Sequence, residues 1–86
     1  MNTLEQIAKG VEATRRDIFA TIQRDEEMTQ LLIEAAQGNP AEISLAKLEH
    51  MIRLEQMNEK LRQANVLRTK IREQKSQELR RRWFAQ

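Results

Sequence analysis

The sequence predicts an all-α fold in which two long antiparallel helices form a helical hairpin. Lys, Arg, Glu, Gln, Leu and Ala dominate its 86 residues, and 33% are charged, a composition typical of long helices and coiled coils. The chain has two glycines and one proline, so few positions force a helix to end. Two of these three residues meet at Gly38-Asn39-Pro40, where we expect the single turn. A short turn between long helices makes them antiparallel neighbours.

The first predicted helix covers about residues 3–37. Asn2 or Thr3 is suited to cap its start, because side-chain oxygens of these types accept hydrogen bonds from free backbone donors. Gly38 is suited to the left-handed conformation that often follows the end of a helix. We therefore expect this helix to end directly before Gly38.

The second predicted helix covers about residues 41–83. Pro40 is tolerated in a first helical turn, and Glu42 lies near the positive end of the helix dipole. Because this helix is longer than the first, its C-terminal part is expected to overhang its neighbour. We treat residues 1–86 as one helical-hairpin domain and residues 80–86 as its basic, aromatic C-terminal tail.

The first helix carries a heptad-like apolar seam that is expected to face the second helix within the hairpin. The seam consists of Leu4, Ile7, Val11, Thr14, Ile18, Thr21 or Ile22, Met28, Leu32 and Ala35. Asp25 occupies one position in this register, which leaves two interpretations. Either the seam is solvated or slipped at Asp25, or the carboxylate is a polar device that sets the register of the two helices.

The second helix carries two apolar stripes that do not share a face. The first stripe, Leu45, Leu48 and Ile52, is expected to complete the intramolecular seam. The second stripe is displaced by roughly 130° on an ideal helix, and we expect it to form the interface with another helix. It consists of Ile43, Leu54, Met57, Leu61, Ala64 and Ile71. Alternatively, the second stripe is the drifting continuation of a supercoiled seam and still serves the one hairpin.

Charge is segregated along the chain. Residues 25–59 carry eight acidic and two basic side chains, a net charge of −6. Residues 60–86 carry nine basic and two acidic side chains, a net charge of +7. With +1 from residues 1–24, the total is +2. A hairpin therefore has an acidic turn end and a basic open end, so opposed copies attract each other and parallel copies in register repel.

No catalytic, metal or cofactor site is expected, and the chain is not expected to be an enzyme. It has no cysteine, and His50 is the only histidine, so a ligand-rich zinc site is excluded. We expect His50 to be a surface or seam residue. The absence of a long apolar run and of a signal-like start predicts a cytoplasmic protein with no membrane span.

The C-terminal tail combines three arginines with two aromatic rings. Arg80, Arg81, Arg82, Trp83 and Phe84 are suited to hold phosphates, anionic lipid or an acidic groove of a partner. We expect this tail to dock on a partner protein. Nucleic-acid binding by the basic C-terminal half remains an alternative, although the acidic half of the molecule repels phosphate.

The turn Gly38-Asn39-Pro40-Ala41, followed by Leu45, Leu48, Ile52 and a long polar helix, resembles the small subunits of type III secretion needles and inner rods. It is also similar to the small helical chaperones that guard them. The resemblance covers about residues 36–71 and implies a secretion-apparatus subunit or chaperone, exported by a non-classical route if it is a subunit. The chain departs from the needle pattern because it has no tyrosine and ends in an arginine-rich segment.

The sequence as a whole predicts a non-enzymatic helical module for protein-protein interaction and assembly. A folded chain of this size buries only about 60% of the surface that its unfolded form exposes, so its own core is thin. We expect it to form a homo-oligomer or to bind a helical partner, assembling into a helical bundle or coiled coil through the second stripe. The alternatives are the type III secretion role and nucleic-acid binding.

Overall fold

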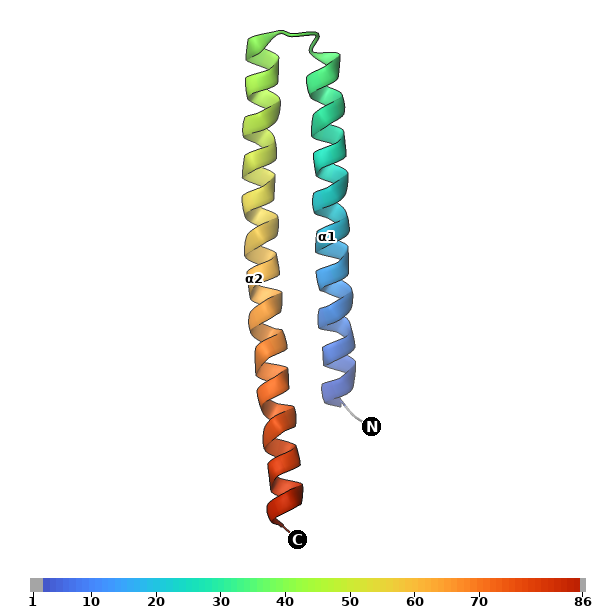
Figure 1. The fold of residues 1–86 in the computed structure, drawn as a ribbon, viewed down its shortest axis with the longest axis vertical. Helices are drawn as coiled ribbons and strands as arrows, with labels where there is room; N and C mark the ends of the chain where they lie inside the picture. Colours follow the sequence, from blue (N-terminus) through green and yellow to red (C-terminus); the bar gives the residue numbers. More distant parts are fainter. Residues whose placement is uncertain (1–2, 86) are drawn as a thin grey trace.

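The computed structural model describes residues 3–85 and confirms the all-α helical hairpin. Helix α1 covers Thr3–Ala35 and helix α2 covers Pro40–Phe84, within two residues of the predicted bounds. The helices run side by side in opposite directions, and α2 extends past the start of α1 at the end that carries both termini (Figure 1). Asn2, the alternative cap, and Gln86, the last residue of the predicted tail, lie outside the described residues.

The turn between the helices is stabilised by Asn39 and by two left-handed residues. The Asn39 side-chain oxygen accepts hydrogen bonds from the backbone N–H groups of Ala41 at 3.0 Å and Glu42 at 3.3 Å. Asn39 thus caps α2, and Pro40 follows as its first residue, where a missing N–H costs nothing. Gly38 adopts the expected left-handed conformation with φ of 80°, and Gln37 before it also has a positive φ, of 49°.

The hairpin is long and thin, with extents of 71 × 18 × 13 Å and a radius of gyration of 20.0 Å. A compact chain of this length has a radius of gyration of about 12 Å. The accessible surface is 7199 Å², whereas a compact monomer of this mass exposes about 5,300 Å². The chain therefore exposes about 1,900 Å² more than a globular protein of its size.

The two stripes of α2 have exchanged their predicted places: the second stripe faces α1, and the first is exposed to solvent. Ala64 and Ile71 of the predicted intermolecular stripe form a core cluster with Val11 of α1. The rest of that stripe is half-buried and consists of Ile43, Leu54, Met57 and Leu61. The stripe is therefore used within the hairpin, as the alternative of a drifting seam predicts, and its contact with another molecule stays a prediction.

The residues predicted to form the α2 side of the intramolecular seam lie outside instead. Leu45 and Leu48 are each 55% exposed and Ile52 is 50% exposed. They share one side of α2 at heptad spacing, but that side faces away from α1. The physical reason lies in the polar contacts between the helices, which are described below.

The seam of α1 is shifted by one residue at alternate positions. Val11 and Ile18 are buried and Leu4 and Ile22 are half-buried, in agreement with the predicted seam. Leu32 is exposed, and so are the seam residues at the alternate positions, namely Ile7, Thr14, Thr21, Met28 and Ala35. The neighbours one residue later take their place, namely Ala8, Arg15, Ile22, Thr29 and Ala36. The core between the helices is consequently built from smaller and more polar side chains than the predicted seam.

Candidate interaction surfaces

Asp25 lies between the two helices and binds two side chains of α2. Its Oδ2 is 2.5 Å from Nδ1 of His50, and its Oδ1 accepts a hydrogen bond of 2.6 Å from Nε of Arg53. The Asp25 side chain is 14% exposed, so the pair of contacts is largely shielded from solvent. Of the two interpretations of Asp25, the structure supports the polar register device, because the carboxylate joins positions far apart in the sequence.

The pKa of Asp25 reflects this environment. Burial by itself raises the pKa of a carboxyl group, because it disfavours the charged form. The hydrogen bond from His50 and then that from Arg53, together with the positive charge of Arg53, outweigh burial and hold the pKa of Asp25 below its ordinary value. The carboxylate is therefore ionised where it contacts α2, and its charge is balanced by that helix.

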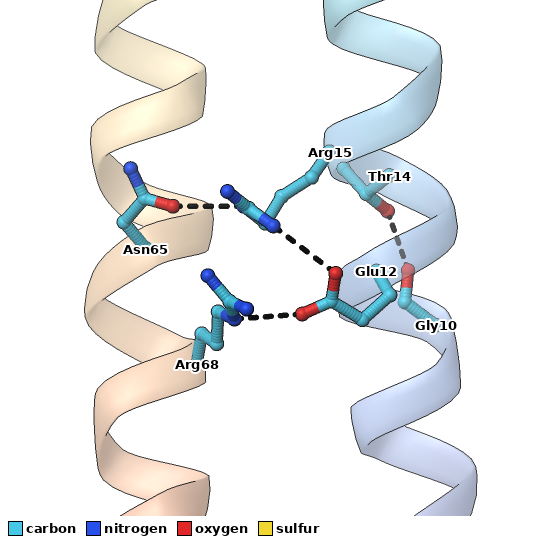
Figure 2. Close-up of polar contacts among 6 residues, drawn as sticks. All are labelled: Gly10, Glu12, Thr14, Arg15, Asn65 and Arg68. Atoms are coloured by element: carbon cyan, nitrogen blue, oxygen red, sulfur yellow. Dashed lines mark hydrogen bonds and ion pairs between the residues drawn. The ribbon is translucent and has the colours of Figure 1, made fainter.

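A second polar cluster joins the helices nearer their open end (Figure 2). Glu12 lies between two arginines, with Oε1 at 2.8 Å from Nε of Arg68 and Oε2 at 3.0 Å from Arg15. The Nε of Arg15 also donates a hydrogen bond of 2.9 Å to the side-chain oxygen of Asn65. The guanidinium of Arg15 lies 5.9 Å from the ring centre of Phe19, within the range of a cation–π contact.

These two clusters explain which stripe of α2 faces α1. His50, Arg53 and Arg68 lie on the side of α2 that carries the second stripe, and they supply the positive charge that Asp25 and Glu12 require. If the first stripe faced inward, Asp25 would meet the neighbourhood of Ile52 and its carboxylate would lose both partners. Because burying a carboxylate without a partner is costly, the two clusters favour the rotation in which the second stripe faces α1.

Sequence reasoning considered Asp25 but did not find the Glu12 cluster. Glu12 and Arg16 have the i, i+4 spacing of an ion pair within α1, yet Glu12 binds Arg15 and Arg68. The available signal was the position of Glu12 directly after Val11 of the seam, on a helix whose antiparallel partner carries Arg68. His50 was expected to be a surface or a seam residue. It lies in the seam, where it contacts Asp25.

A group of exposed apolar side chains lies near the turn. We call it the turn-end surface, and it consists of Met28, Leu32, Ala35, Leu45, Leu48 and Ile52, all of them exposed. A groove between the two helices brings Leu32 and Ala35 of α1 beside Leu45 of α2. Met28 lies seven residues before Ala35 and Ile52 seven residues after Leu45, so each extends the same helix face away from the turn. Leu48 lies between Leu45 and Ile52 on α2.

Two carboxylates line the groove of the turn-end surface. Glu42 makes no ion pair with any residue that the structure describes. Glu49 is 3.9 Å from a terminal guanidinium nitrogen of Arg53, at the limit of an ion pair, and is 52% exposed. The groove therefore combines an apolar floor with unneutralised negative charge.

The predicted docking tail continues α2 beyond the start of α1. Trp83 is 79% exposed and Phe84 is 87% exposed, the two highest values among the exposed large apolar side chains of the described chain. Within the described residues, none of Arg80, Arg81 and Arg82 makes an ion pair. The helix ends at Phe84, and the N–H of Ala85 donates a hydrogen bond of 2.9 Å to the carbonyl of Arg81. The tail thus presents its charge and its rings on a helical scaffold.

Neither a metal site nor a membrane span is found in residues 3–85. No group of three or more His, Asp or Glu side chains in this range is arranged to hold a metal ion. Neither helix, over its described length, has a stretch that is apolar enough to cross a bilayer. The features that remain for function are the turn-end surface and the tail.

Comparison with protein-family models, with curated proteins and with solved structures finds no match to this chain. The resemblance to type III secretion subunits and chaperones therefore stays a prediction.

Proposed function

We propose that this chain is a non-enzymatic assembly module that associates with another helical surface through the turn-end surface. The proposal replaces the second stripe of α2, which is used within the hairpin, with the leucine-rich surface that the hairpin leaves open. The observation that carries it is the groove that Leu32, Ala35 and Leu45 form between the helices beside an area of exposed apolar side chains.

The elongated hairpin exposes enough surface to form a protein-protein interface. Each partner of a standard protein-protein interface buries about 800 Å², which is less than the excess of about 1,900 Å² that the elongated hairpin exposes. Clustered apolar side chains at half exposure gain free energy when a partner removes them from water, at about 25 cal/mol for each Å². Contiguous apolar patches on small proteins commonly mark interaction sites.

A type III secretion subunit or chaperone is one biological setting in which such a module works. That setting rests on the Gly38-Asn39-Pro40 turn and the leucines after it, as described above. Nucleic-acid binding by residues 60–86 is the rival function. Two ion pairs already use part of that basic charge, since Arg68 binds Glu12 and Arg62 lies 2.7 Å from Glu59.

The mass of the protein in solution tests the proposal. Light scattering or sedimentation is expected to show a mass above that of one 10.2 kDa chain, and the mass is expected to fall towards one chain on dilution. Replacing Leu45→Glu and Leu48→Glu together is expected to give a folded monomer. A wild-type protein that stays monomeric at high concentration, in the absence of any partner, would rule out self-association.

A matched control places the same two charges elsewhere at the same end of the hairpin. Gln23 and Gln30 are exposed and lie seven and fourteen residues after Arg16, which is on the side of the Glu12 cluster. Gln23→Glu with Gln30→Glu adds the same negative charge but leaves the turn-end surface intact. This control is expected to keep the wild-type mass, and an equal loss in both variants would mean that charge alone causes dissociation.

A further inference from the structure

We propose that the occupant of the turn-end surface is the C-terminal tail of a second copy, in an antiparallel two-fold pair. Each tail then lies beside the turn of the other hairpin. This inference rests on the proposed function and adds the partner, its orientation and the segment that makes contact.

Charge complementarity is the first argument. The groove carries Glu42 and Glu49 beside its apolar floor, and the tail carries three arginines without ion pairs among the described residues. In an antiparallel pair the acidic end of each copy, with its net charge of −6 over residues 25–59, faces the basic end of the other. A parallel pair would bring like charges together at both ends.

The lengths of the helices provide the second argument. Two copies of α2 that overlap completely from Pro40 to Phe84 in opposite directions bring residues whose numbers sum to 124 to the same height. This register sets Leu45 level with Leu79 of the second copy. The same register sets Glu42 level with Arg82 of that copy. The apolar and charged groups of the groove therefore lie level with groups of matching chemistry on the second copy.

The tail extends past the start of α1, and Leu79 and Arg82 line a pocket with Leu4 and Glu5 of that helix. Consecutive residues of a helix are 100° apart, so Arg80, Arg81 and Arg82 point in three directions around the axis. Phe84 lies between Arg80 and Arg81 around the axis, and Leu79 and Trp83 lie between Arg82 and Arg80. Each arginine of the tail therefore lies next to an apolar side chain. Arginine beside an aromatic ring is a favoured combination at protein interfaces.

The two-fold pair makes the tail contact twice. In an isologous interface, the contact of one tail with the other turn is repeated by symmetry. After the first contact forms, the second is intramolecular and gains from a high effective concentration. An open chain of copies, by contrast, makes one tail contact at each step and leaves a free groove at its end.

Cysteine cross-linking distinguishes these arrangements, because the described chain has no cysteine of its own. Ala35→Cys places a thiol in the groove, and Ala85→Cys places one at the end of the tail; both alanines are exposed. A mixture of the two single variants is expected to give a covalent dimer with a short thiol cross-linker, whereas neither variant alone gives one. Cross-linking of Ala35→Cys to itself would overturn the antiparallel orientation.

The double variant separates a closed pair from an open chain. Within one molecule the two thiols lie at opposite ends of a 71 Å hairpin and are out of reach of each other. A closed pair yields only covalent dimers, and a ladder of larger species would overturn the two-fold arrangement. A wild-type protein that is dimeric by mass but gives no link between positions 35 and 85 would overturn this inference and leave the proposed function standing. A monomeric protein would overturn this inference and would leave, of the proposed function, only association with a different partner.

Charge removal provides a second readout without cross-linking. Arg81→Gln with Arg82→Gln is expected to raise the Kd of the dimer about tenfold, since exposed charge pairs contribute modestly. Lys9→Gln with Arg16→Gln removes the same charge from the open end but leaves the tail intact, and it is expected to change the Kd much less. Equal changes in the two variants would show that net charge, and not the tail, drives the pairing.

Discussion

The two halves of the hairpin fill the space between their helices with side chains of different size. Near the open end, Val11 and Ile71 pack with Ala64. Near the turn, the buried side chains are Thr29, Ala36 and Ala46. In the open half, large apolar side chains such as Val11 and Ile71 are fully buried, whereas in the turn half the fully buried side chains are small and larger ones such as Ile43 and Leu54 are only half-buried.

This difference indicates that the open half contributes most to the stability of the hairpin, whereas the turn half offers apolar side chains for binding. Burial of apolar area stabilises the open half, because each buried methylene contributes about 0.8 kcal/mol. In the turn half, where the fully buried side chains are small, the Asn39 cap and the contacts of Asp25 add to the stability. Leu32, Leu45 and Leu48 of this half remain on the surface, where the proposed pairing uses them.

The largest effect is expected in the open half, from Ile71→Ala. This change removes buried methylenes from the core cluster and is expected to lower the free energy of unfolding by about 2 to 4 kcal/mol. Denaturant unfolding followed by circular dichroism, at one fixed protein concentration, measures it. Val66→Ala, at a half-exposed position of the same helix, is the matched control and is expected to cost less. Equal costs would contradict an apolar core in the open half.

A smaller effect is expected in the turn half, from Asp25→Asn. The amide cannot accept two charge-assisted hydrogen bonds as the carboxylate does, so His50 and Arg53 lose their ionic partner. Because Arg53 is 40% exposed and stays partly hydrated, we expect a loss of about 1 to 2 kcal/mol. Glu12→Gln in the open half is the control, and its loss is expected to be smaller because Glu12 is more exposed than Asp25.

The same variant changes the response of stability to acid. The pKa of Asp25 is lower in the folded chain than its ordinary value of 3.8. Its ionised form therefore stabilises the fold fully above that value, and this stabilisation is lost as pH falls through the lower pKa of the folded state. Unfolding measured at falling pH is expected to show a steeper loss in the wild type than in Asp25→Asn. Parallel pH curves would contradict the role of Asp25.

The smallest effect is expected from Thr29→Val, and it has the opposite sign. The Thr29 hydroxyl is buried and has no hydrogen-bond partner within the described residues. Valine has nearly the same shape and removes the unpaired group, so we expect a gain of about 1 kcal/mol. Thr21→Val is the control, because the Thr21 hydroxyl is exposed and donates to the Asp17 carbonyl at 2.8 Å. Loss of stability in Thr29→Val would show that the hydroxyl has a partner.

The helices, the turn and the segregation of charge were predictable from local sequence. Gly38 and Pro40 restrict their own backbone angles, and Asn39 caps α2 with its own side chain, so no distant residue is needed to place the turn. The segregation of charge follows from the order of the charged residues along the chain. In two antiparallel helices, the distance of a residue from the turn sets its height in the hairpin.

Only the tertiary structure decided how the helices are rotated against each other. The stripes through Leu45 and through Ala64 both have heptad spacing, so periodicity within α2 does not distinguish them. The choice depends on what α1 presents at the same height, and there Asp25 and Glu12 require cations. The side of α2 that carries His50, Arg53 and Arg68 supplies them, and the leucines near the turn are left outside because that side faces inward.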